Sequence, residues 1–263
     1  TYPDVLSMSY SAGLKTKAVP LDERGIIDSC GDLGCNDALY LIPSFQNPTG
    51  RTISHEGRKA ILEIAARRGF WIIEDDAYGE LRYGEQSVPA LRALESAERV
   101  IYLGSFSQLL FPGLRQGYAL VPEEIAEDFR EALSHSAGAV SSLVQYLVSG
   151  FLEEGCLEPC LERARAAMSV RMRALAEGLR EALPCLVFDV PQGGIYLWVT
   201  MPAASDESLE QRAVEAGVSV VSGRHFSYYR EKTSSVRLSI SRLGCPFIKE
   251  AATRLVSAWG ERL

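Results

Sequence analysis

The feature that most constrains the fold is an alternation of short apolar runs with an amphipathic helix. Residues 38–43 form a continuous apolar run of the kind found in strands of parallel sheets. A helix is predicted over residues 56–68, with Ser54 as its N-cap and Gly69 at its end, and a second apolar run follows at residues 70–73. A strand, a helix and a strand in this order predict a doubly wound α/β sheet.

A third strand is predicted over residues 100–103, which are β-branched and aromatic. It leads into a loop of small residues that contains Gly104, Ser105, Ser107 and Arg115. Backbone amides, hydroxyl groups and a guanidinium at the carboxyl end of a strand are suited to binding an anion. The loop therefore predicts a phosphate site.

Residues 104–115 resemble the cofactor-lysine loop of the class I/II pyridoxal-phosphate (PLP) aminotransferases of fold type I. This chain fits that loop at nearly every position, but Gln108 stands where the family has its catalytic lysine. The resemblance implies that Ser105 and Ser107 donate to the phosphate of PLP and that Arg115 pairs with it.

Two further motifs follow the first two apolar runs. Residues 47–50 read Asn-Pro-Thr-Gly; in the family the Asn binds the cofactor's 3-hydroxyl, a role that falls to Asn47, whereas a motif alone would predict only a chain reversal. The acidic residues 74–76 could suggest a metal site. The resemblance instead implies that Asp75 pairs with the pyridinium nitrogen and that Tyr78 donates to the 3-oxygen.

The second half of the chain matches the family as well. The matching stretches, in order, are residues 191–198, 222–226 and 235–241. By resemblance, Arg237 grips the α-carboxylate of the substrate with a bidentate fork. The resemblance implies a partial large PLP-binding domain over residues 1–150, with a doubly wound, mostly parallel sheet, and a small α+β C-terminal domain over residues 151–263.

The residues around the acidic cluster 74–76 are similar to those in one branch of the family. That branch contains kynurenine and 2-aminoadipate aminotransferases and MocR-type regulators.

The sequence resembles the family, but Gln108 cannot perform the chemistry of the family's lysine, because an amide is neither nucleophilic nor basic near neutral pH. Three hypotheses follow. In the first, the chain has lost lysine chemistry and serves as a binding or partner subunit for a small-molecule amino acid or 2-oxo acid, with PLP held non-covalently if at all. Alternatively, lysine was replaced by design in a working aminotransferase. Thirdly, another base substitutes, for which His135 and His225 are the imidazole candidates.

The chain opens at Thr1-Tyr2-Pro3, a tripeptide that follows a strand in the family. We therefore expect it to begin partway into the domain, without the portion that supplies a phosphate-binding turn and an aromatic that stacks on the cofactor. A homodimer, or a partner chain that supplies the missing portion, is the predicted assembly.

Composition excludes several classes of function. The 27 basic and 34 acidic residues give a net charge of −7, which disfavours nucleic-acid binding. No apolar run reaches the length of a membrane span, and no secretory signal pattern opens the chain. The six cysteines lack the spacing of a zinc site and are expected to be reduced thiols in a cytoplasmic protein.

Some local elements are also predicted. We expect a short strand over residues 15–20, a loop over residues 21–27 and a short helix over residues 90–97.

Overall fold

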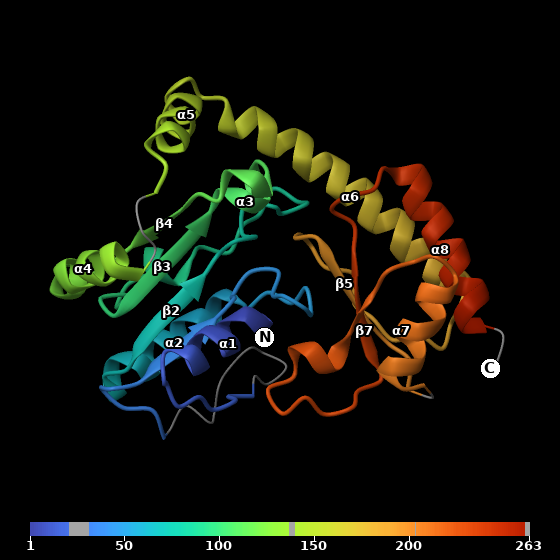
Figure 1. Ribbon diagram of the computed structural model, residues 1–263, viewed down its shortest axis with the longest axis horizontal. Coiled ribbons are helices and arrows are strands. Elements are labelled where there is room, and N and C mark those ends of the chain that lie inside the picture. Colours follow the sequence, from blue (N-terminus) through green and yellow to red (C-terminus); the bar gives the residue numbers. More distant parts are fainter. Residues whose placement is uncertain (21–31, 137–139, 203, 261–263) are drawn as a thin grey trace. The chain divides into compact units, whose positions relative to one another are not determined.

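The computed structural model describes residues 1–20, 32–136, 140–202 and 204–260 (Figure 1). The predicted loop over residues 21–27 and Cys30 lie outside the described residues. The chain divides into two compact units. The three-stranded unit comprises Thr1–Ala18, Phe45–Arg51 and Arg165–Leu263, and the four-stranded unit comprises Val19–Ser44 and Thr52–Ala164. The domain boundary at residues 150/151 stays a prediction.

The four-stranded unit is built on a mostly parallel sheet. Its strands are β1 (Ala38–Leu41), β2 (Trp71–Asp75), β3 (Val100–Ser105) and β4 (Gly117–Leu120), in the order β1-β2-β3-β4 (Figure 1). The first three strands are parallel, and β4 runs antiparallel to β3. The carboxyl ends of β1, β2 and β3 therefore meet at one edge of the sheet, as the sequence predicted.

Helix α2 (His55–Arg68) connects β1 to β2. The Ser54 side chain accepts a hydrogen bond from the Gly57 N–H at 3.1 Å, and Gly69 ends the helix in the left-handed region at φ 80°. The apolar face of α2 packs on the strands in one core. That core comprises Leu39, Leu41, Ile53, Ile61, Leu62, Ala65, Phe70, Ile72, Leu91, Ala97 and Val100. Both predicted caps are confirmed.

Two local predictions are wrong. Residues 15–20 form no strand: Lys15, Thr16 and Lys17 are exposed, and of this segment only Val19 packs against the hydrophobic core. The helix predicted over residues 90–97 is only a 3₁₀ turn, Leu91–Ala93. A buried carboxylate from β2, described below, holds the first backbone amides of that turn.

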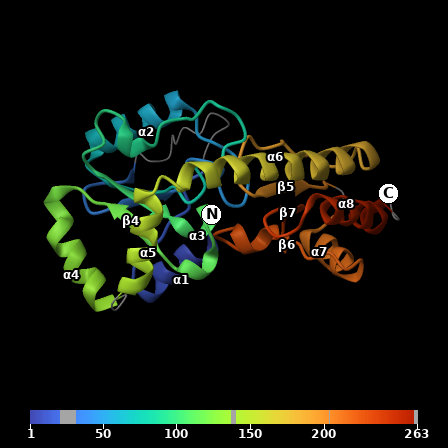
Figure 2. The same ribbon diagram turned by 90° about the horizontal axis from the view of Figure 1, so that it is seen from above.

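The remaining regular elements in the described part of the four-stranded unit are helical. It contains α3 (Phe106–Leu109), the 3₁₀ turns η3 (Pro112–Leu114) and η4 (Glu123–Ile125), and the helices α4 (Ala126–Ser136) and α5 (Ser142–Glu153). The long helix α6 (Leu157–Ala182) begins in this unit and continues into the three-stranded unit from Arg165 (Figure 2).

The three-stranded unit has an antiparallel sheet in the order β5-β7-β6. Its elements are α1 (Pro3–Ser11), β5 (Tyr196–Thr200), α7 (Asp206–Glu215), β6 (Val221–Ser222), the 3₁₀ turn η5 (Gly223–Phe226), β7 (Ser235–Ser239) and α8 (Cys245–Gly260). Helices α7 and α8 pack against each other, and the buried Trp259 indole donates to the Leu209 carbonyl at 3.0 Å. A small antiparallel sheet with helices is the α+β arrangement predicted for the C-terminal part.

None of the helices in the described ranges is both long and apolar enough to cross a membrane.

Candidate functional site

The sequence-predicted site residues fall in both units. The four-stranded unit holds Asp75, Tyr78, Ser105, Ser107, Gln108 and Arg115, and the three-stranded unit holds Asn47 and Arg237.

Asp75 is the last residue of β2. Its carboxylate accepts hydrogen bonds from the Tyr40 hydroxyl at 2.5 Å and from the Ala77 N–H at 3.3 Å. Burial raises the pKa of Asp75, and these two hydrogen bonds only partly offset the rise. Among the described residues no cationic side chain pairs with Asp75. A half-buried carboxylate of this kind is suited to a cationic N–H of a bound molecule.

The two acidic neighbours of Asp75 have other partners. Glu74 is fully buried and accepts the backbone N–H groups of Leu91 at 2.7 Å and Arg92 at 2.9 Å, which is why that segment forms a tight turn. Asp76 accepts from the Tyr102 hydroxyl at 3.0 Å. Burial raises the pKa of both carboxyls. The described ranges contain no group of three or more His, Cys, Asp or Glu side chains that could hold a metal ion.

Arg58 on α2 is a structural residue that the sequence analysis missed. Its side chain is buried, and it donates to the carbonyl groups of Ile53 at 3.1 Å, Pro43 at 3.0 Å and Pro89 at 2.9 Å. A further bond of 2.9 Å reaches the Ser44 hydroxyl. Arg58 thereby fixes the loop that leaves β1. A charged residue on a helix gave no sequence signal, because most such residues are exposed.

The loop after β3 forms α3 directly at the end of the strand. Ser105 is its N-cap, and its hydroxyl oxygen accepts from the Ser107 N–H at 3.2 Å. Gln108 lies within α3 and is half-buried. Arg115 follows η3 at φ 48° and is exposed. The two serines thus stand at the same sheet edge as Asp75, since β2 and β3 are parallel neighbours with Asp75 opposite Leu103.

Gly104, near the end of β3, leaves room for an aromatic ring. Gly104 pairs with Tyr118 on β4, and a Cβ at Gly104 would lie 2.2 Å from the Tyr118 ring. The ring of Tyr118 also lies 5.6 Å from that of Phe106 and 6.0 Å from that of Tyr102, measured between centroids. Tyr78, the remaining predicted residue of this unit, is 7% exposed.

In the three-stranded unit, Arg237 and Asn47 are brought together. The Arg237 Nη1 donates to the Asn47 Oδ1 at 2.7 Å across 190 residues of sequence. The Arg237 Cζ lies over two aromatic rings, 4.1 Å from the Tyr196 centroid and 4.7 Å from the Phe226 centroid. An arginine oriented by an amide and two rings is suited to binding a carboxylate with its planar fork.

Asn47 is itself held in a buried turn and is 2% exposed. The Gln46 side-chain oxygen accepts from the Thr49 N–H at 3.0 Å and from the Thr49 hydroxyl at 2.6 Å, and the Gly50 N–H donates to the Gln46 carbonyl at 2.7 Å. The turn is packed closely, because a Cβ at Gly193 would lie 2.3 Å from the Phe45 ring. The turn therefore does more than reverse the chain: it presents Asn47 to Arg237.

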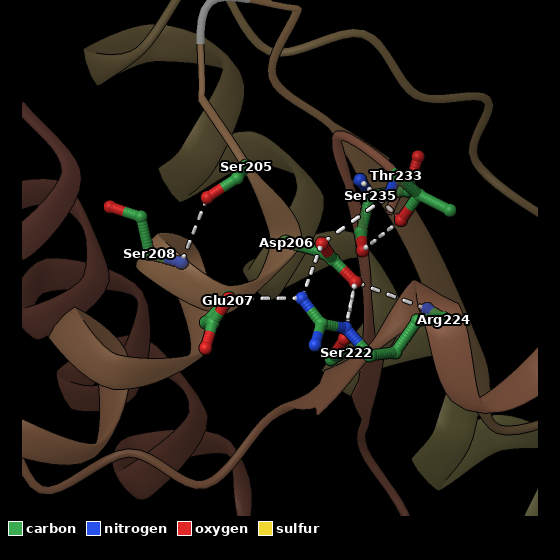
Figure 3. Close-up of polar contacts among 8 residues, drawn as sticks. All are labelled: Ser205, Asp206, Glu207, Ser208, Ser222, Arg224, Thr233 and Ser235. Carbon is green, nitrogen blue, oxygen red and sulfur yellow. Dashed lines mark hydrogen bonds and ion pairs between the residues drawn. The ribbon is translucent and has the colours of Figure 1, made fainter. Parts of the chain in front are cut away.

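A second polar cluster in this unit surrounds Asp206, the first residue of α7 (Figure 3). Asp206 is fully buried and accepts from the Ser222 hydroxyl at 2.5 Å, from the Thr233 N–H at 3.3 Å and from Arg224. Burial by itself raises the pKa of Asp206, but the hydrogen bonds, chiefly those from Arg224 and Ser222, outweigh it and hold the pKa well below its usual range. Nothing in the sequence pattern singled out this residue.

The imidazole candidates do not lie in buried surroundings. His135 near the end of α4 and His225 in η5 are both exposed.

The sheet order and the small antiparallel sheet define the aminotransferase fold of type I. The structure aligns over 100% of its length, at a TM-score of 0.91 and 30% identity, with 68% of the kynurenine aminotransferase of Pyrococcus horikoshii. The family model "Aminotransferase class I and II" matches residues 30–255. The chain belongs to the class I and II aminotransferase family.

Two curated relatives show the breadth of this family. The chain is 38% identical over 222 residues to the 2-aminoadipate transaminase of Thermus thermophilus, a match that covers 82% of this chain and 56% of the relative. It is 33% identical over 207 residues to the HTH-type transcriptional regulator YisV of Bacillus subtilis, covering 76% of this chain and 42% of that protein. The chain spans about half the length of the curated relatives that it matches.

Proposed function

We propose that this chain binds an amino acid or 2-oxo acid together with PLP, and that it does not by itself complete transamination. The observation that carries the proposal is the Arg237 guanidinium, which Asn47 holds at 2.7 Å and the Tyr196 and Phe226 rings flank. Holding an arginine in one orientation costs side-chain entropy, which a carboxylate ligand repays through a bidentate, charge-assisted pair.

The donor set of the four-stranded unit fits PLP. Ser105, Ser107 and Arg115 supply hydroxyl and guanidinium donors for a phosphate. Asp75 supplies a carboxylate without a cationic partner among the described residues, which fits a protonated ring nitrogen. When bound, PLP supplies an electron sink for the Cα of an amino acid. The Tyr78 hydroxyl is the proposed donor from this unit to the 3-oxygen of PLP.

Gln108 limits what this site can do. Its place in α3, three residues after Ser105, supports the proposal that it occupies the family's lysine position. The amide can donate and accept hydrogen bonds, but it cannot bond covalently to an aldehyde or carry a proton to and from Cα. The exposed His135 and His225 offer no buried base in its place. We therefore expect PLP to be held non-covalently.

We further propose that the chain works as a homodimer or together with a partner chain, the assembly that its resemblance to the family implies.

The test is calorimetric titration with 2-oxoglutarate in the presence of PLP. We expect saturable binding by the wild type and a loss of about 1.5–3 kcal/mol, roughly 10- to 150-fold in affinity, for Arg237→Lys, which keeps the charge but loses the fork. Arg242→Lys is the matched control, because Arg242 is exposed just after β7. Equal affinities in Arg237→Lys and wild type, or no binding by the wild type, would overturn the proposal.

A second candidate is the sensing of such a ligand within a larger regulator. The match to an HTH-type transcriptional regulator supports it, and a sensor needs binding without turnover. Fusing the chain to a separate DNA-binding segment and measuring ligand-dependent changes in DNA affinity would test it; no ligand effect would refute it.

A further inference from the structure

The buried cluster around Asp206 lies next to the residues that hold Arg237. Asp206 joins three separate segments of the three-stranded unit: the start of α7, the β6–η5 corner and the residues that enter β7 (Figure 3). Its own N–H donates to the Thr233 carbonyl at 2.8 Å, so the contact with the third segment runs in both directions.

The contacts to the β6–η5 corner are the most numerous. One oxygen of Asp206 accepts the Ser222 hydroxyl at 2.5 Å and both the N–H and the Nε–H of Arg224 at 3.2 Å. The other oxygen accepts the Arg224 Nη2 at 3.4 Å. One fully buried carboxylate therefore fixes both the backbone and the side chain of the corner.

The β6–η5 corner places the Phe226 ring next to the Arg237 guanidinium. Phe226 comes two residues after Arg224, is 6% exposed, and lies edge-on to Trp198 at 6.0 Å between centroids. Trp198 stands opposite Arg237 in the β5–β7 pairing. The corner has no spare room, since a Cβ at Gly223 would lie 2.6 Å from the Ser235 carbonyl oxygen. Small shifts of the corner must therefore move the Phe226 ring.

We propose that Asp206 is a positioning residue, which fixes Phe226 and through it orients the guanidinium of Arg237 for a carboxylate ligand. The inference rests on the proposed function, because it assigns Arg237 to acid binding. It adds a residue that touches neither the ligand nor Arg237 and acts through the β6–η5 corner. Losing Asp206 leaves the buried Ser222 hydroxyl without its acceptor and removes the contacts that fix the partly exposed Arg224, so the corner must rearrange.

The test compares Asp206→Asn with Glu207→Gln as the matched control. Glu207 also pairs with Arg224, at 3.2 Å, but it is exposed, so the control removes an acidic partner from the same arginine without disturbing the buried cluster. Ser222→Ala removes a single hydrogen bond from Asp206 and serves if Asp206→Asn does not fold.

The primary readout is the Nε–Hε signal of Arg237 in isotope-labelled protein, assigned by its loss in Arg237→Lys. The Arg58 signal, which belongs to the other unit, is the internal reference. We expect Asp206→Asn or Ser222→Ala to shift or broaden the Arg237 signal and to weaken 2-oxoglutarate binding about tenfold. Glu207→Gln should leave both at wild-type values.

The outcomes separate this inference from the proposed function. If the wild type binds no 2-oxoglutarate, the proposed function fails, yet the Arg237 signal still reports whether Asp206 positions that side chain. If the Arg237 signal in Asp206→Asn and Ser222→Ala matches the control while only the thermal midpoint falls, Asp206 is merely structural and the inference is overturned.

Discussion

Replacing Arg58 with methionine tests the account of the four-stranded unit. Arg58 is fully buried and donates to three carbonyl groups and one hydroxyl, and its Nη1 lies 4.0 Å from the buried Glu74 carboxylate. Methionine has a similar length and fills much of the volume, but it donates no hydrogen bond. The substitution therefore removes the polar contacts with little change in packing.

The expected loss of unfolding free energy is about 3–5 kcal/mol, the range for removing one partner of a buried ion pair. Two effects contribute: the carbonyl acceptors at the end of β1 lose their donor, and Glu74 keeps a buried charge that Arg58 no longer compensates. Such a loss is a large fraction of a total stability of about 5–15 kcal/mol.

Equilibrium urea unfolding followed by circular dichroism measures the loss. Arg67→Met is the matched control on the same helix: Arg67 is 68% exposed and pairs with Glu63 at 3.9 Å, so its loss should stay within about 0.5 kcal/mol. A value for Arg58→Met as small as that of the control would refute the argument that Arg58 holds the loop after β1.

Three further predictions concern stability. Gly223→Ala should lower the free energy of unfolding by about 1–3 kcal/mol, because a Cβ at this position would lie 2.4 Å from the Thr233 hydroxyl oxygen. Gly150→Ala should raise it by about 0.5–1 kcal/mol, because a Cβ there would meet nothing within 4 Å. Equal effects of the two substitutions in urea unfolding would contradict this. Because the pKa of Asp206 is depressed in the folded state, its carboxylate stabilises the fold above the ordinary Asp pKa of about 4, and this contribution is lost as the pH falls below that value. In Asp206→Asn, the thermal midpoint should therefore fall less steeply with decreasing pH on the acid side. Burial raises the pKa of Asp76, so this group acts in the opposite sense: the folded state retains its proton longer, and the stability that it contributes falls as the pH rises above about 4. Asp76→Asn should reduce that fall. An unchanged profile in either variant would refute the corresponding assignment.

The sequence predicted the elements that depend on local patterning. The parallel strands, the caps of α2 and the Asn-Pro-Thr-Gly turn follow from apolar runs and turn residues over a few positions. Both Asn47 and Arg237 were predicted as site residues, but their pairing was not predictable, because 190 residues separate them.

The features that were missed depend on tertiary contacts. Glu74 is a buried cap for the backbone amides of residues 91 and 92, and the helix expected after residue 90 is a single turn there. Arg58 and Asp206 are buried charges whose partners come from distant segments. A single charged residue in a sequence is far more often exposed, so its burial becomes visible only when its hydrogen bonds are known.

The most direct test of the central claim is borohydride treatment of the chain with PLP, followed by peptide mapping, in the wild type and in Gln108→Lys. We predict no cofactor adduct in the wild-type peptide that spans residues 104–115, which contains no lysine, and a stoichiometric adduct at position 108 in the variant. A stoichiometric adduct at one specific site of the wild type would contradict non-covalent binding, and the absence of an adduct in Gln108→Lys would contradict the placement of residue 108 at the cofactor.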